Sequence, residues 1–596
     1  MVRTWVRGWR VAAVTVLAVT AIPAAVPAAA AADVSDSSDT FAALVRQNDA
    51  QVAGWLQALP SRAGSPREAA RLLKLSAAAH AHPGSRWHRH PQVLALIETL
   101  VARLRARQNA DGTFDAEFAA GNPQSPPDAG FLIRHLAQSK ALLDAGADPA
   151  TAPVRAVLHE LLARSAPMLR TGGVHTPNHR WVICGALAHL NALQPAPANV
   201  ARIDDWLGEG IDQDPDGQFS ERSTIYSGVT VEALLDLAIQ LQRPALLEPI
   251  RRHLEFLLLN ADPDGELDTL ASRRQDQQGR EPRRLAAYYV ALRHLAIVQG
   301  NGRFAAAARL VERTDLARVT DHVAEWMLWP SLRQPLPVLA PLPDDYARHF
   351  PHSGLVRVRR GPVTASIFGG SDWAKVRDIS SGLSTNPTFF RFRKGAAVLE
   401  SVRLTPGFFN LGYFRSDGLE VSADGREYRL AQTQRAAYYQ PLPAAARRPD
   451  GDYPLTSDGR FYSKMDFPAR PRDEKQLTTR VTVRERAGAP GEFELVCDIS
   501  GTAGIGVVLE LCFRPGGTFA GVEPREAEPD TFVLKSGTGR YTVGTDTIEF
   551  GPGTYGPSRI NLSGEEYSWR NGQLRAEGQR VYLSGVTPFR QTLVIR

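Results

Sequence analysis

The hydrophobic residues of this chain change their spacing part-way along it, and no other feature restricts the fold as strongly. From about Thr40 to Trp329, apolar residues recur at intervals of three and four, as in PQVLALIETLVARLRARQ and VTVEALLDLAIQLQ. This spacing places them on one face of a helix. After Pro330, short runs such as GLVRVRRG, TRVTVRER and FELVCDISG alternate apolar and polar residues, which is typical of half-buried strands. The chain is therefore predicted to be helical first and β second.

The loops between the helical segments repeat one theme. An Asp-Gly pair followed two residues later by a hydrophobic residue occurs in 110–114, 214–219 and 262–267. Helix pairs joined by recurring Asp-Gly turns predict stacked hairpins that curve into a solenoid or toroid with a groove at one end. A four-helix bundle is less suitable, because the helices are too many and the long loops recur regularly.

The length of 596 residues exceeds the size at which one hydrophobic core stops growing, so two large domains are expected. The predicted fold class is α+β multidomain. Residues 33–330 are expected to form an incomplete (α/α) toroid that carries the catalytic groups. The proline-rich residues 331–345 cannot continue a helix and are expected to form a linker. Residues 346–596 are expected to form an antiparallel β-sandwich.

Residues 1–32 have the pattern of a secretory signal peptide. Three early arginines precede an apolar run from Val11 to Ile22, and small residues follow from Ala28 to Ala32. Cleavage is predicted near Ala30 to Ala32, which implies a secreted, extracellular protein. No later stretch is apolar enough to span a bilayer, so no membrane partner is expected.

Net charge argues against nucleic acid as a partner. The formal charge of the whole chain is +6, and the predicted leader contains three arginines and no acidic residue, which leaves +3. The mature balance is only mildly basic, and no basic-aromatic motif accompanies it.

The three cysteines do not form a disulfide framework or a metal-binding spacing. Cys497 and Cys512 lie in consecutive strand-like runs, so both a cross-strand disulfide and two buried thiols are compatible with the sequence. No metal or other cofactor is expected.

Polar residues that are suited to catalysis gather in three successive loops between helices. The loop 171–181 contains Asn178 and His179, the loop 216–226 contains Glu221, Arg222 and Tyr226, and the loop 268–276 contains Arg273 and Arg274. In a toroid these loops converge on one rim.

This combination matches what β-elimination at a uronic acid requires. The C5 proton is a very weak acid, so the carboxylate must first be neutralised by a hydrogen-bonding or protonated partner such as Asn, His or Arg. A base then removes the proton and an acid protonates the leaving O4, and tyrosine or histidine can serve in both roles.

The order of Asn178-His179, then Asp216-Gly217-Gln218-Phe219 and Tyr226, on a helical half followed by a β half, resembles the heparinase II/III-like and alginate-lyase-like polysaccharide lyases. The resemblance covers nearly the whole mature chain in architecture, and its motifs are short. It implies that Asn178 and His179 neutralise the substrate carboxylate, that His179 can also act as base, and that Tyr226 is the acid or both acid and base. The implied activity is that of a carbon-oxygen lyase that acts on a uronic-acid-containing polysaccharide.

The sequence departs from this family in its β half, where a histidine or tyrosine usually joins the site. No clear His-x-His pattern stands at the first strands, where the sequence instead has 384–387. The alternatives that remain open are His349, His352, Tyr413, Tyr438 and Tyr439.

Other polar residues are candidates for substrate binding. The loop 121–128 carries the side-chain amides of Asn122 and Gln124, which suit sugar hydroxyls, and its prolines favour a rigid turn. Glu221, Arg222, Arg273 and Arg274 are the other candidate substrate-binding residues, because arginine suits the capture of acidic groups.

Two other functions fit parts of the sequence. An (α/α)-toroid glycoside hydrolase needs two carboxylates, for which Asp216 with Glu221, or Asp264 with Glu266, are candidates. A non-catalytic glycan-binding protein would use the arginines but would not need Tyr226. The lyase interpretation accounts for more residues than either alternative.

Overall fold

The architecture is taken from a computed structural model. It describes residues 37–58, 64–114, 123–276, 281–376, 379–525, 528–556 and 578–596. The signal peptide predicted at 1–32 and the candidate Asn122 lie outside the described residues.

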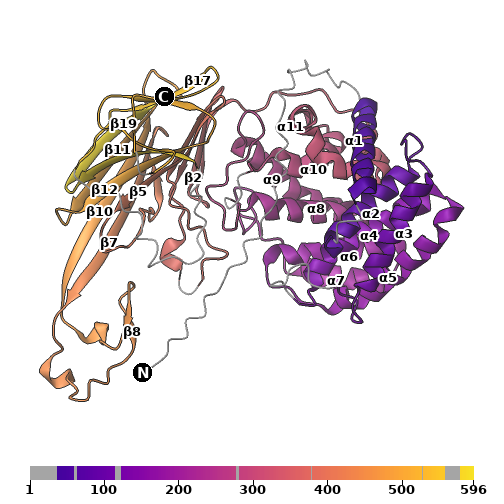
Figure 1. Cartoon of the computed structure of the whole chain (residues 1–596), viewed down its shortest axis with the longest axis horizontal. Helices are drawn as coiled ribbons and strands as arrows, with labels where there is room; N and C mark the ends of the chain where they lie inside the picture. Colours follow the sequence, from indigo (N-terminus) through magenta and orange to yellow (C-terminus); the bar gives the residue numbers. More distant parts are fainter. Residues whose placement is uncertain are drawn as a thin grey trace.

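The first half of the chain is helical and the second half is built of strands, as the spacing of hydrophobic residues predicts (Figure 1). The helices are α1 (Ser37–Ala58), α2 (Pro66–Ala81), α3 (Pro91–Ala106), α4 (Pro126–Gly146), α5 (Ala152–Thr171), α6 (Pro177–Leu193), α7 (Pro197–Gly208), α8 (Thr224–Gln240), α9 (Leu247–Asn260), α10 (Tyr289–Gln299), α11 (Gly302–Thr314) and α12 (Val323–Leu328). Every helix in the described parts of the chain is too short or too polar to cross a bilayer.

The helices pack in two rows. In the inner row, α2 packs on α4, α4 on α6, α6 on α8 and α8 on α10. Each inner helix also contacts the helix that follows it in the chain, α3, α5, α7, α9 or α11, and these form the outer row. The inner helices α4, α6 and α8 have buried residues around most of their circumference, as expected for helices enclosed by neighbours.

The recurring Asp-Gly turns have one shared geometry. Gly112, Gly217 and Gly265 all have positive φ, between 86° and 92°. A short β-bridge closes each turn, namely Gln108 with Phe114, Gln213 with Phe219 and Ala261 with Leu267. A Cβ atom on Gly112 or Gly217 would lie 2.3 or 2.5 Å from a backbone oxygen of the next outer helix. Only glycine fits, because it tolerates both the conformation and the close approach.

The strands form two large sheets. They are β1 (Asp345–Phe350), β2 (Leu355–Arg360), β3 (Val363–Phe368), β4 (Phe390–Lys394), β5 (Ala397–Pro406), β6 (Leu419–Val421), β7 (Glu427–Tyr439), β8 (Thr456–Ser457), β9 (Tyr462–Ser463), β10 (Arg472–Glu485), β11 (Phe493–Gly501), β12 (Gly506–Phe513), β13 (Thr518–Ala520), β14 (Glu523–Pro524), β15 (Thr531–Val533), β16 (Gly539–Val543), β17 (Asp546–Gly551), β18 (Gln579–Val586) and β19 (Phe589–Ile595).

The sheet orders are β1-β2-β3-β4-β5-β12-β18-β15-β14 and β13-β16-β17-β19-β11-β10-β7-β6. Pairing is antiparallel except between β15 and β18, which run parallel. Side chains from both sheets share one hydrophobic core. Cys497 on β11 and Cys512 on β12 belong to different sheets, so the cross-strand disulfide is not formed and both side chains are buried.

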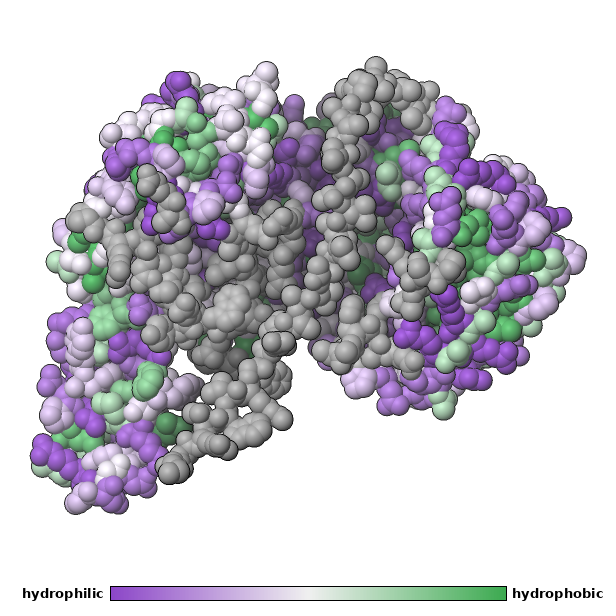
Figure 2. Space-filling view, in the orientation of Figure 1, coloured by the Kyte–Doolittle hydropathy of each residue, from purple (hydrophilic) through white to green (hydrophobic). Residues whose placement is uncertain are grey.

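A long arm extends from the β half. Strands β7 and β10 pair over their whole length, and the segment between them carries the small β8-β9 hairpin. The arm projects away from both halves (Figure 1). Hydrophobic patches are visible on it (Figure 2), and Leu455, Phe461 and Tyr462 are among its exposed residues.

Buried ion pairs join the two halves. Asp262 and its neighbours in the third Asp-Gly turn face arginines of the nine-stranded sheet. Arg357 binds Asp262 at 2.8 Å and Asp268 at 3.4 Å, and Arg391 binds Asp262 and Glu266, both at 2.8 Å. The first strands also pack on the helical core through Phe350, Leu355 and Phe368. These contacts fix the β half against the rim that carries the polar loops.

Candidate active site

Asn178 and His179 lie in the first turn of α6, which Pro177 opens. Proline is favoured there because its missing N–H has no helical partner to lose. The Asn178 side chain is buried, and its Nδ2 donates to Oε2 of Glu221 at 2.8 Å. Its Oδ1 is also buried but has no hydrogen-bond donor in the described structure. An orphan acceptor at this position is costly unless a ligand satisfies it.

His179 packs between two rings. The His175 ring lies edge-on with its centroid 4.9 Å away, and the Phe131 ring of α4 lies 6.4 Å away. Nδ1 of His179 is buried and has no partner among the described residues. Burial, aided by the charges of His175 and Arg274, lowers the pKa of His179 to about 4. The ring is therefore neutral at pH 7, so it is able to accept a proton.

Tyr226 stands in the first turn of α8. Ser223 caps this helix, because its Oγ accepts from the Tyr226 N–H at 3.1 Å. Asp276 from the next loop holds the cap in place, since its carboxylate accepts from the Ser223 hydroxyl at 2.5 Å and the Thr224 N–H at 2.6 Å. The backbone that carries Tyr226 is thus fixed from two loops.

Glu221 and Arg274 connect the asparagine to the tyrosine. Glu221 accepts from Asn178 through one oxygen and forms a close ion pair with Arg274 through the other. The Arg274 guanidinium lies over the Tyr226 ring, 4.1 Å from its centroid. Asn178, Glu221, Arg274 and Tyr226 therefore form one continuous chain of contacts across the three loops.

Arg273 and Arg222 lie beside this cluster at the seam with the β half. Arg273 pairs with Asp372 at 2.9 Å, and its backbone N–H donates to the Glu221 carbonyl. The Arg222 guanidinium donates to the backbone carbonyl of His352. The β half thus reaches the catalytic loops at two points.

Of the two amides predicted in 121–128, only Gln124 lies in the described structure. It is exposed, has a φ of 49°, and precedes the Ser125 cap of α4. No contact joins Gln124 to the Asn178–Tyr226 cluster among the described residues. The helix that it precedes contributes Phe131 instead.

The β-half candidates for a second catalytic group have different surroundings. Tyr438 is exposed on β7 and packs on Phe409, and Tyr413 is buried. His352 lies at the seam, where its N–H donates to Asp216 at 3.2 Å and its carbonyl accepts from Arg222.

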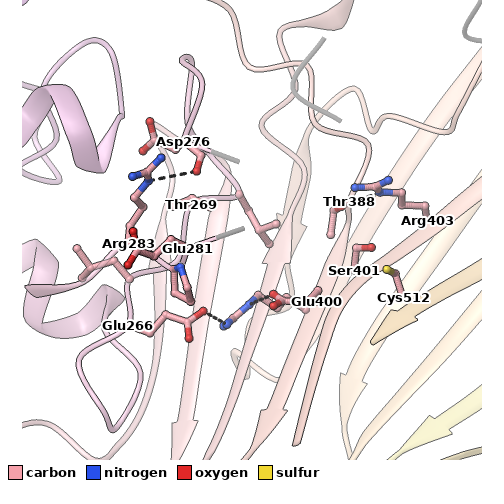
Figure 3. Close-up of a pocket in the computed structure, with 14 residues that line it drawn as sticks. Glu266, Thr269, Asp276, Glu281, Arg283, Thr388, Glu400, Ser401, Arg403 and Cys512 are labelled. Atoms are coloured by element: carbon pink, nitrogen blue, oxygen red, sulfur yellow. Dashed lines mark hydrogen bonds and ion pairs between the residues drawn. The ribbon is translucent and has the colours of Figure 1, made fainter. Parts of the chain in front are cut away.

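A charged cavity lies next to the cluster, between the helical loops and the nine-stranded sheet (Figure 3). Its walls hold Glu266, Asp276 and Arg283 on the helical side and Arg403 and Glu400 on the sheet side. Asn178, His179 and Tyr226 are not part of its lining. Asp276 is shared by both features, because it lines the cavity and also holds the cap below Tyr226.

The roles of three residues in the site were not predicted from the sequence. Asp276 fixes the start of α8, Phe131 packs on His179, and Asp372 brings a β-half loop to Arg273. Asp276 stands at the end of the loop 268–276, which is one of the three polar loops identified from the sequence. Asp372 carries no local signal, because its partner is 99 residues away.

No protein-family model matches this sequence, and the curated proteins include no similar sequence. Solved structures do match. A Streptomyces coelicolor A3 chondroitin AC lyase in complex with chondroitin sulphate is 13% identical, with a TM-score of 0.52, 93% of this chain covered and 79% of that chain. A Paenibacillus xanthan lyase is 12% identical, with a TM-score of 0.55 and 94% of this chain covered. This chain shares its fold with polysaccharide lyases.

The match to the xanthan lyase spans 57% of that longer chain. Heparinase III also matches, at 13% identity and a TM-score of 0.48, with 90% of this chain covered and 78% of that chain. The matches to the chondroitin AC lyase and the xanthan lyase, which cover 93% and 94% of this chain, extend over both the helical half and the β half.

Proposed function

We propose that this protein is a polysaccharide lyase that cleaves a uronic-acid-containing polysaccharide by β-elimination. The observation that supports this most is the linked set of Asn178, Glu221, Arg274 and Tyr226 beside a neutral His179. A shared fold alone would not argue for chemistry.

Asn178 and His179 receive the substrate carboxyl group in this proposal. The orphan Oδ1 of Asn178 is an acceptor, so it matches a carboxyl group that carries a proton. A protonated carboxyl group is the neutral form that makes the C5 proton more acidic. The unpartnered Nδ1 of His179 offers a second polar contact on the next residue of the chain.

Tyr226 transfers the protons. A base removes the C5 proton, the C4–C5 double bond forms, and the C4–O4 bond breaks as O4 receives a proton. Tyr226 serves as acid, or as both acid and base, and His179 is the alternative base. The Arg274 guanidinium lies over the Tyr226 ring and places a cation beside the group that transfers the protons.

Glu221 acts by position rather than by reaction. Its two oxygens are already engaged by Asn178 and Arg274, so it orients both. The same pairing argues against the alternative function of a glycoside hydrolase, because that reaction needs two available carboxylates. Of the other carboxylates suited to hydrolysis, Asp264 and Glu266 are paired with Arg393.

The remaining parts of the proposal concern architecture and location. We infer that the two-row helical array of residues 33–330 is an incomplete (α/α) toroid, joined through 331–345 to the β-sandwich of 346–596. We also infer that residues 1–32 are removed near Ala30 to Ala32, and that the enzyme acts outside the cell on an acidic polysaccharide, without a cofactor.

The test is ultraviolet absorbance of the unsaturated product while the purified mature protein is incubated with a panel of uronic-acid polysaccharides. A rise with one polymer that disappears in Tyr226→Phe, while the variant still binds that polymer, is the expected result. New reducing ends without the absorbance would indicate hydrolysis. Binding without either product, unchanged in Tyr226→Phe, would indicate a glycan-binding protein.

A further inference from the structure

The three arginines of the catalytic loops differ in how their charges are balanced. Arg273 pairs with Asp372, and Arg274 pairs with Glu221. Within the described ranges, Arg222 has no carboxylate at ion-pair distance, and its one side-chain hydrogen bond goes to the neutral carbonyl of His352. A guanidinium has five N–H donors, so most of those on Arg222 have no protein acceptor.

The nearby carboxylates are already occupied. Asp372 accepts from Arg273 at 2.9 Å, from Lys375 at 2.7 Å and from the Ser384 N–H at 3.1 Å. Asp216 accepts from the His352 N–H at 3.2 Å. Burial and the charge of Arg273 lower the pKa of Arg222, which means that its surroundings disfavour the bare cation. An additional anion at this place would compensate Arg222, which has no carboxylate at ion-pair distance among the described residues.

The backbone conformation of Arg222 also supports a functional role. Its φ is 48°, a left-handed conformation that favours glycine and is unfavourable for arginine. The backbone conformation therefore does not explain why residue 222 is an arginine. Strain of this kind at a half-buried charge is typical of a functional site.

We propose that Arg222 binds a second acidic group of the substrate, a carboxylate or a sulfate, on a sugar next to the uronate that reacts. The inference rests on the proposed lyase function, because it takes the substrate to lie along the loop from Arg222 to Tyr226. It defines the substrate class as polymers with acidic groups on neighbouring sugars. Hyaluronan, which has a carboxylate on alternate sugars and no sulfate, falls outside this class.

The experiment compares wild type with Arg222→Gly and Arg222→Lys. Glycine suits the left-handed backbone, and this gain offsets the loss of the hydrogen bond from Arg222 to the His352 carbonyl, so Arg222→Gly should fold with a thermal stability close to that of wild type. Gln242→Gly is the matched control, because Gln242 is exposed, has a φ of 53° and follows the other end of α8. Binding and initial elimination rates are measured at low salt with polyglucuronate, chondroitin 4-sulfate and hyaluronan.

Wild type and Gln242→Gly should bind polyglucuronate or chondroitin 4-sulfate about tenfold or more tightly than hyaluronan, as expected for a charge-assisted contact. Polyglucuronate tests a carboxylate and chondroitin 4-sulfate tests a sulfate. Arg222→Gly should lose this preference, because binding of polyglucuronate and chondroitin 4-sulfate should weaken much more than binding of hyaluronan, whereas Arg222→Lys should retain part of it.

The two proposals fail separately. An Arg222-dependent preference in binding, without any unsaturated product, would support the subsite and contradict the lyase. Elimination that Arg222→Gly leaves unchanged in rate and preference would overturn the subsite and keep the lyase. An equal loss of affinity for all three polymers would also contradict the proposed subsite, because it would show that Arg222 does not distinguish substrates by a second acidic group.

Discussion

Two neighbouring loop regions of the helical array use the same kinds of side chain in opposite ways. In the interdomain lattice, formed by Asp262, Asp264, Glu266 and Asp268 with Arg357, Arg391 and Arg393, buried carboxylates and guanidinium groups pair with one another. In the three polar loops that carry the proposed site, Asn178 Oδ1 and His179 Nδ1 are buried, and within the described ranges they have no partner and Arg222 has no carboxylate at ion-pair distance.

The difference separates stability from function. A buried charge is tolerated when it is paired, so the lattice holds the two halves together. A buried polar atom without a partner costs stability, and the lattice has one as well at Nε of Arg357, so the contrast rests on the buried charges, which are paired in the lattice. Changes in the lattice should therefore lower the free energy of unfolding, and changes in the catalytic loops should lower turnover.

The largest expected effect is on turnover in the catalytic loops. Asn178→Ala removes the amide that receives the substrate carboxyl group, so kcat should fall by about 10²-fold to 10³-fold, as for the loss of one electrostatic contact to a transition state. Initial rates of unsaturated product measure this. The free energy of unfolding in urea should fall by about 1.5–3 kcal/mol, the value of one hydrogen bond to a charged group, here Glu221. A global loss of stability would place Asn178 with the lattice instead.

The next effect is on stability in the lattice. Asp262→Asn removes a carboxylate that pairs with Arg357, Arg391 and Arg393, and leaves these cations uncompensated in a buried position. Unfolding in urea should show a loss of about 3–5 kcal/mol. Turnover per folded molecule should remain close to wild type. A variant of normal stability would mean that the lattice does not join the halves.

The pH dependence of kcat/KM tests whether neutral His179 takes part in the reaction. Its pKa in the folded protein is about 4, below the usual 6.5 for histidine. If neutral His179 is needed, kcat/KM should fall as the pH drops through about 4, and not near 6.5. A pH profile of initial rates measures this, and an acid limb near 6.5 would contradict the assignment.

The same depressed pKa has a consequence for stability with a definite sign. Between pH 6.5 and 4, His179 is protonated in the unfolded state and neutral in the folded state. The free energy of unfolding therefore decreases as the pH falls through this range. His253 is fully enclosed and has a pKa of about 4, which adds to the trend. Rates at low pH should therefore be read only where circular dichroism shows the folded protein.

The smallest effect is expected at an exposed ion-pair group on α9. Arg251 pairs with Glu248 and Glu255, both at 2.6 Å, so it has as many partners as a lattice arginine but lies in water. Arg251→Gln should change the free energy of unfolding by less than about 1 kcal/mol. A loss as large as that of Asp262→Asn would show that the number of pairs matters more than their burial.

The order of helices and strands was readable from the sequence because each periodicity is local. Runs of three-and-four spacing give helices, and the Asp-Gly pairs mark turns whose glycines have positive φ. The parallel pairing of β15 with β18 was not predicted, since it joins residues about fifty positions apart. The disulfide considered for Cys497 and Cys512 is absent because the consecutive strands enter different sheets.

The candidate site was visible in part. Asn178, His179, Glu221, Tyr226 and Arg274 stood out as polar residues in successive loops, and the structure brings them together. Their pairing was not readable, because contacts between loops depend on how the hairpins stack. Gln124 was predicted from its side-chain amide in a proline-rich loop, and it is exposed and has no contact with the cluster among the described residues, so its role in substrate binding stays a prediction.

The glycine turns at 112, 217 and 265 have an evolutionary consequence. Each of these three turns combines a glycine of positive φ with a closing β-bridge, so its backbone path does not depend on the side chains of the residues that follow it. Loops can then diverge one at a time under selection while the glycine stays constant. A new specificity would need only the exchange of one loop, and the rest of the scaffold could be inherited unchanged.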